Sequence, residues 1–220
     1  MAGETYRIMF GAAGWRHAAW QTIFYPDDLP EEWQLGYYGN EFPVVLFPAD
    51  YWSLADESIA EWLSDCGDAL QFVCEFSSPA QFQDQAGRLA LFSGRCCGVI
   101  CRLSPDEMTA GLPDSLPETE VPLSVDTAGQ PVSPEATQLL QARGISLVRY
   151  DVAADIPVAQ GRFVCTRVNS ETTDMRALRR IIESLLSQTS ARQTVVIIFD
   201  GTPPRIDVMR NAVVLLDLID

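Results

Sequence analysis

The chain has 220 residues, of which 47% are hydrophobic and 20% charged, and this composition excludes an intrinsically disordered chain. Fifteen basic residues stand against thirty acidic ones, which gives a formal net charge of −15. Such a charge repels phosphate backbones and anionic lipids, so a nucleic-acid or membrane partner is not expected. No lysine occurs, which excludes Schiff-base lysine chemistry and a Walker-type phosphate loop.

The sequence shows neither a membrane-spanning run nor a signal peptide, and both observations bear on the location of the protein. No apolar run approaches the ~18 residues of a membrane-spanning helix. The opening segment MAGETYRIMF lacks the basic region and apolar core of a signal peptide. We therefore expect a cytoplasmic protein whose six cysteines stay reduced. Zinc-type Cys-x-x-Cys spacing is missing, so we assign no metal site and interpret the cysteines as buried apolar residues, with Cys97 and Cys101 on one strand face.

Eight short runs rich in β-branched and aromatic residues predict strands. They lie at 7–11, 42–47, 70–76, 97–103, 122–126, 145–151, 162–168 and 194–200.

Helices are predicted between several of these strands. The stretch 53–66 has Ser53 as its expected N-cap, and 133–144 has a serine cap, a proline in the first turn and a closing glycine. Helical spacing of apolar residues also predicts helices within 170–188 and 207–220.

Strands and helices alternate without a linker-like Pro/Gly/Ser stretch, which predicts a parallel sheet. Eight strands favour a closed barrel over an open sheet. We expect one (β/α)8 TIM-type barrel domain over residues 1–220, compact because about 250 residues are typical. The proline-containing stretch 103–121 is expected to be a loop, with one or two helices degenerate there.

In such a barrel the functional residues gather at the carboxyl ends of the strands. Four predicted strands end on a carboxylate, which gives the candidate catalytic residues Glu75, Asp126, Asp151 and Asp200. Strand alternation points Glu75, Arg167 and Asp200 into the barrel mouth above apolar residues. Alternation does not decide the direction of Asp151, because Arg149 shares its face.

The carboxylates allow two functional interpretations and one structural one. A pair of carboxylates serves glycoside hydrolysis, and three or more hold a hard divalent cation. Strand-end carboxylates also cap helices or form ion pairs, and for any single residue we favour that interpretation.

Candidate ligand-binding residues are Trp15, His17, Arg102, Arg167 and Asn169. Arginines at a barrel mouth hold a carboxylate or phosphate, and they equally pair with the neighbouring carboxylates. His17 is the only histidine, hence the first candidate for proton transfer, or else a residue bordering a helix near Trp20. Aromatic residues stack on sugars or bases, and more often they fill the core.

The first quarter of the chain resembles the YecE-like family, domain of unknown function 72. The resemblance rests on Gly11, Gly14, Trp15, Trp20, Phe24, Tyr25, Pro26, Leu35, Tyr37, Tyr38 and Phe42. It implies an eight-stranded (β/α) barrel and no particular reaction.

Several polar positions of the family pattern are changed. Where the family has glutamate and asparagine in the second strand, this chain has Leu46 and Pro48, and Glu75 replaces a lysine. The Arg-x-His-Gly of the seventh strand is here Arg167 to Ser170. These changes indicate altered or lost chemistry.

Two functions follow from these observations. The first is a barrel that binds a small molecule or a partner without the ancestral chemistry. The alternative is a hydrolase- or isomerase-type enzyme that uses strand-end carboxylates and arginines on an anionic or sugar-like substrate. A mouth filled by aromatic residues, with both arginines paired, would argue against the enzyme. The sequence indicates no cofactor and no oligomeric state.

Overall fold

The computed structural model describes residues 8–104, 107, 116–117, 119–150, 161–190 and 192–219. Within these residues the strands form one parallel sheet in the order β6-β5-β4-β3-β2-β1-β9-β8-β7. The strands are β1 (Ile8–Ala13), β2 (Val44–Phe47), β3 (Gln71–Phe76), β4 (Cys96–Arg102), β5 (Leu123–Asp126), β6 (Ser146–Leu147), β7 (Arg149–Tyr150), β8 (Phe163–Asn169) and β9 (Thr194–Asp200).

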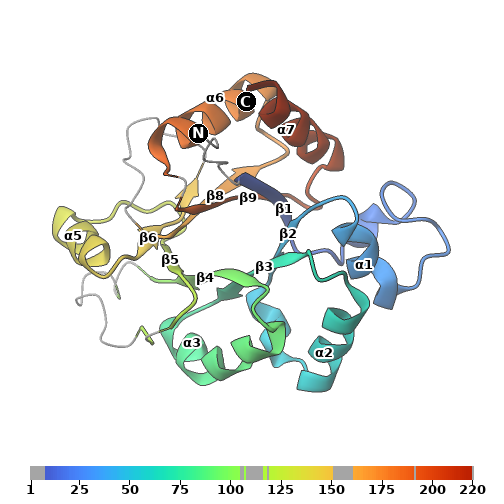
Figure 1. The fold of residues 1–220 in the computed structure, drawn as a ribbon, viewed down its shortest axis with the longest axis horizontal. Coiled ribbons are helices and arrows are strands. Elements are labelled where there is room, and N and C mark those ends of the chain that lie inside the picture. Colours follow the sequence, from blue (N-terminus) through green and yellow to red (C-terminus); the bar gives the residue numbers. More distant parts are fainter. Residues whose placement is uncertain are drawn as a thin grey trace, which may run out of the picture.

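The two end strands of this sheet are neighbours in the chain. Only Val148 separates β6 from β7, and its N–H donates to the carbonyl of Val125 in β5 at 2.8 Å. One segment therefore pairs with β5 on one side and with β8 on the other, and the sheet curls into a barrel (Figure 1). Counted as one strand, β6 and β7 give the eight strands expected from the sequence. The barrel prediction is confirmed.

Helices surround the barrel (Figure 1). They are α1 (Gln34–Gly39), α2 (Asp56–Asp65), α3 (Pro79–Gln85), α5 (Pro134–Ala142), α6 (Met175–Gln188) and α7 (Ile206–Ile219). Short 3-10 turns add η1 (Ala18–Trp20), η2 (Glu31–Trp33), η3 (Ala49–Ser53) and η4 (Ala86–Phe92). No helix in the described parts of the chain is long and apolar enough to cross a membrane.

The helix caps agree with the sequence in one case and differ in another. Ser133 caps α5, because its Oγ accepts from the N–H of Ala136 at 3.2 Å. The cap predicted at Ser53 is wrong. The backbone is extended at Leu54 and Ala55, so α2 begins only at Asp56, and Ser53 closes η3 by donating to the carbonyl of Asp50. Most of 103–121 lies outside the described residues.

Two apolar layers stabilise the barrel. The inner layer fills its interior and consists of Met9, Val44, Leu46, Val73, Ile100, Val148, Phe163, Cys165, Val196 and Ile198. The outer layer is larger and lies between strands and helices. It holds the big aromatic residues, among them Trp15, Phe47 and Trp52. The barrel interior is therefore a packed core whose free end is at the mouth.

A bulge in β4 changes one expected pattern. Phe72 and Val73 of β3 pair with Cys96 and Gly98, so β4 uses one extra residue. Beyond it, Cys97 packs against the inner layer while Cys101 belongs to the outer one. The prediction of one shared face is wrong because a bulge reverses the alternation. None of the six cysteines, all of which lie in the described residues, forms a disulfide, and all but the half-buried Cys97 are buried.

Gly11 and Gly14 stand at positions where the backbone leaves no room for a side chain or needs a left-handed turn. A Cβ at Gly11 would lie 1.9 Å from the carbonyl oxygen of Val44, so β1 and β2 approach more closely than a side chain allows. Tyr38 reinforces this contact, since its hydroxyl accepts from the N–H of Ala12 at 2.8 Å and donates to the Val44 carbonyl at 2.9 Å. Gly14 has φ +80°, which turns the chain out of β1.

Candidate functional site

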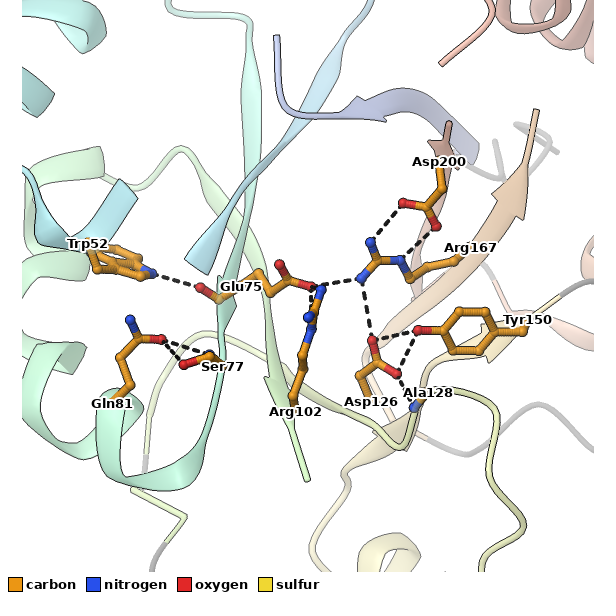
Figure 2. Close-up of polar contacts among 10 residues, drawn as sticks. All are labelled: Trp52, Glu75, Ser77, Gln81, Arg102, Asp126, Ala128, Tyr150, Arg167 and Asp200. Carbon is orange, nitrogen blue, oxygen red and sulfur yellow. Dashed lines mark hydrogen bonds and ion pairs between the residues drawn. The ribbon is translucent and has the colours of Figure 1, made fainter. Parts of the chain in front are cut away.

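Five charged side chains converge at the barrel mouth, from the ends of five strands. We call Glu75 (β3), Arg102 (β4), Asp126 (β5), Arg167 (β8) and Asp200 (β9) the mouth network (Figure 2). It lies above the inner apolar layer, as strand alternation predicted for Glu75, Arg167 and Asp200. Three carboxylates against two guanidiniums give this network a formal charge of −1.

Arg167 is the centre of the network. Its Nε and Nη2 donate to the two carboxylate oxygens of Asp200 at 2.9 and 2.7 Å, a bidentate pair. Its Nη1 donates to Glu75 at 2.7 Å and to Asp126 at 3.4 Å. One buried guanidinium therefore connects carboxylates from three other strands.

Glu75 receives both arginines on one oxygen. Its Oε1 accepts from Nη1 of Arg167 and from Nε and Nη2 of Arg102, the latter at 3.1 and 2.8 Å. Its second oxygen, Oε2, has no hydrogen bond to any described residue, and Figure 2 shows it directed away from both arginines. Arg102 has no partner but Glu75 within the described chain, and half of its side chain is exposed.

Asp126 is saturated. The hydroxyl of Tyr150 lies 2.8 Å from each of its carboxylate oxygens, and the N–H of Ala128 donates to Oδ1 at 2.7 Å. Tyr150 was missed as a site residue. Its position in a predicted strand was an available signal, because alternation places Tyr150 on the same face as Val148, a residue of the inner layer.

The ionisation of the mouth follows from burial and charge. Burial lowers the pKa of Arg167, but its hydrogen bonds with Asp200 and the charges of Asp200 and Glu75 outweigh burial and raise that pKa. Burial, with the hydrogen bond to Asp126, raises the pKa of Tyr150, which stays a protonated donor. Arg167 is therefore a permanent cation.

A cleft of about 520 Å³ opens beside the mouth network. Glu75, Arg102 and Arg167 form its charged wall, and Asp50, Ser77 and Gln81 add polar groups. The opposite wall is apolar and consists of Ala13, Leu46, Pro48 and Ala49. We call this the mouth cleft. It lies at the carboxyl ends of β1 to β4, and it has the size of a small-molecule site.

The other candidate residues lie elsewhere. Trp15 is 1% exposed, and packs in the outer core against Phe47, Tyr51 and Trp62. Trp52 likewise lies outside the barrel, stacked on Phe76, so neither of these tryptophans fills the mouth.

Two further candidates, Asn169 and His17, are polar and bond to nearby backbone groups, although Asn169 pairs in register with Asp200 of the mouth network. Asn169 is exposed, and its side chain accepts from the N–H of Glu171. His17 precedes η1 and forms no side-chain cap; its Nε2 lies 3.0 Å from the carbonyl oxygen of Ala13. Asp151 lies outside the described residues.

The arrangement limits the chemistry that the carboxylates can perform. Asp126 and Asp200 have both oxygens bound, so proton transfer by either would break charge-assisted hydrogen bonds. Across the described residues no three His, Cys, Asp or Glu side chains are grouped to hold a metal ion. A guanidinium occupies the centre of the carboxylate cluster, where a bound cation would have to lie.

Comparison with known proteins agrees with the sequence resemblance. A family model described as "Protein of unknown function DUF72" matches residues 9–86. The first part of the chain carries the DUF72 pattern. The DUF72 match covers β1 to α3, hence the wall of the mouth cleft up to Gln81 but neither Arg102 nor Arg167. No curated protein matches the chain.

A solved structure extends the likeness to the whole fold. The crystal structure of a DUF72 family protein from Thermotoga maritima has a TM-score of 0.72 with this chain at 14% sequence identity. The superposition covers 97% of this chain and 99% of that one. At this identity the likeness to the DUF72 structure concerns the barrel alone. The residues of the mouth network must be interpreted from their own geometry.

Proposed function

We propose that the protein binds a small carboxylic acid with an amino or hydroxyl group in the mouth cleft, without turning it over. The proposal rests on the difference between the two arginines of the network. Arg167 is fully engaged by three carboxylates, whereas Arg102 is half-exposed in the cleft with a single partner. Arg102 is therefore the guanidinium available to a ligand carboxylate.

The remaining groups of the cleft define the rest of the ligand. Glu75 Oε2 is an acceptor without a partner among the described residues, which suits an ammonium or hydroxyl group. Leu46 and Pro48 offer a short apolar wall. Binding without turnover is supported by the ion pairs of Asp126 and Asp200, which remove two of the three strand-end carboxylates from acid–base work.

The test uses amino acids and 2-hydroxy acids as probes. In ¹⁵N spectra of the arginine Nε–H groups, a binding probe should shift the Arg102 signal more than the Arg167 signal. Arg102→Gln should weaken binding about tenfold or more, since a charge-assisted hydrogen bond is lost. Arg179→Gln, on the exposed side of α6, is the matched control and should leave binding unchanged. Undiminished binding by Arg102→Gln would overturn the proposal.

One observation favours an enzyme as the second candidate. Glu75 Oε2 faces the cleft without a partner, so Glu75 is the one described network carboxylate positioned to accept a proton from a substrate. The two functions separate in a single experiment. If a bound probe is converted, and Glu75→Gln abolishes conversion while binding persists, the enzyme replaces the binding protein.

A further inference from the structure

A second cleft, of about 350 Å³, lies outside the mouth network. It is formed by the turn after β1, the start of α1 and η3. Its lining includes Arg16, His17, Gln21, Glu31, Gln34 and Tyr51. We call it the amide cleft, because two glutamine side chains line it. Its lining includes the only histidine of the chain, which does not line the mouth cleft.

Gln34 is the most unusual residue of this cleft. It is the first residue of α1 and is 95% buried, with 5% of its surface exposed. Its side-chain amide forms no hydrogen bond with any described residue, although it lines the cleft. An amide on so little exposed a residue normally has partners, and the cleft that Gln34 lines is the side from which a partner can reach it. Such a group indicates that a molecule absent from the chain itself supplies the partner.

Three further polar side chains line the same cleft. The Oε1 atom of Gln21 is fully buried without a hydrogen-bond partner. The hydroxyl of Tyr51 has no hydrogen-bond partner in the described parts of the chain, and its ring is held edge-on by Trp15 and Phe47. His17 donates from Nε2 to the Ala13 carbonyl, because a carbonyl only accepts, and Nδ1 is then an acceptor.

The charge of the amide cleft is balanced. Arg16 and Glu31 form an ion pair with each other, and Arg16 also lies over the Trp62 ring at 5.4 Å. Burial lowers the pKa of His17, which favours the neutral imidazole. No uncompensated charge is left to select an anion or a cation. The groups that need partners are amides, a hydroxyl and an imidazole nitrogen, which together require both donors and acceptors.

We propose that the amide cleft is a second ligand site that binds a neutral polyhydroxylated molecule of monosaccharide size. Each hydroxyl of such a ligand both donates and accepts, so it satisfies the Gln34 amide and the Tyr51 hydroxyl together. The site is distinct from the mouth cleft, because neither Glu75 nor Arg102 lines it.

The probes are glucose, galactose, mannose, xylose, ribose and myo-inositol. Binding is followed by saturation-transfer NMR on each probe and by tryptophan fluorescence, since Trp15 and Trp62 contact Tyr51 and Trp20 contacts His17. Gln34→Met keeps the length of the side chain and removes its polar atoms. It should weaken binding about tenfold or more and leave thermal stability equal or higher, because an unpartnered buried amide is removed.

Two variants complete the test. Tyr51→Phe removes only the hydroxyl and should also weaken binding. Gln141→Met replaces an exposed residue of α5 and should leave binding unchanged. Arg102→Gln should leave sugar binding unchanged, which separates this site from the proposed function. The inference is overturned if no probe binds at millimolar concentration, if Gln34→Met binds as wild type, or if Gln34→Met destabilises the protein as a purely structural residue would.

Discussion

At the scale of single residues, Arg167 is the side chain on which the barrel mouth depends most. Its guanidinium is the shared counterion of Glu75, Asp126 and Asp200, and its side chain is 9% exposed. A buried ion-pair network adds little net stability, but removing one of its members lowers the stability strongly. Without Arg167, Glu75 would keep only Arg102, and Asp126 would keep only the neutral donors Tyr150 and Ala128.

Replacing Arg167 therefore predicts a large effect. Arg167→Met should lower the free energy of unfolding by about 3–5 kcal/mol, because the buried Glu75 and Asp126 and the half-buried Asp200 lose this shared counterion. Urea unfolding measures it. Arg179→Met, which removes an exposed pair with Glu183, should change stability by less than about 1 kcal/mol. Equal losses in both variants would contradict the central role of Arg167.

His17 predicts a pH dependence whose sign follows from burial. Its folded pKa lies below the ordinary value of 6.5, mainly because of desolvation. Between these two values the unfolded chain binds more protons, so stability falls as the pH drops from about 7.5 through 6.5 toward the folded pKa. His17→Gln should lose less stability over this interval than wild type, as measured by urea unfolding at each pH. Parallel curves for the two proteins would refute the shift.

At the scale of elements, the strands were predictable because each is a short apolar run with turns on both sides. All eight runs became strands, with ends displaced by up to two residues. The direction of Arg167, Asp200 and Glu75 into the mouth was predictable for the same reason, since a strand alternates with period two. The bulge at Cys97 was not predictable, because the composition of β4 does not show where β4 has an extra residue that pairs with none in β3.

One glycine of β4 tests how tightly the barrel interior is packed. A Cβ at Gly98 would lie 2.4–2.5 Å from ring atoms of Phe163, a fully buried residue below the mouth network. Gly98→Ala should therefore destabilise the protein by about 1–3 kcal/mol. Thermal unfolding compares it with Gly87→Ala, where a Cβ meets nothing within 4 Å. A stable Gly98→Ala variant would show that the ring has room to move.

At the scale of the whole molecule, the net charge is −15, and the arginines Arg16 and Arg102 of the two clefts are paired with glutamates. Both features disfavour the binding of a polyanion such as DNA. We expect no binding to duplex DNA even at low salt, where electrostatic attraction is strongest. A mobility-shift experiment at micromolar protein measures this, with a basic DNA-binding protein as positive control. A complex that dissociates as salt is added would contradict the expectation and restore a nucleic-acid function.

The sites were less predictable than the barrel, because the sequence gives neither the distances between side chains nor their hydrogen-bond partners. The residues of the mouth network could be named from strand ends, but which oxygen each arginine binds depends on side-chain geometry. The amide cleft could not be found from the sequence. Gln34 and Tyr51 are ordinary in pattern, and only the folding of α1 and η3 around the turn after β1 places their side chains in one cleft with His17.

The left-handed turn at Gly14 has a consequence for both clefts. A Cβ there would lie 3.5 Å from Pro48, in the wall of the mouth cleft, and 3.8 Å from His17, in the wall of the amide cleft. The partition between the two sites is thus one residue thick and carries no side chain. We expect a molecule that pushes this partition to change the affinity of the other site, and thermodynamic reciprocity requires the second ligand to act on the first by the same factor.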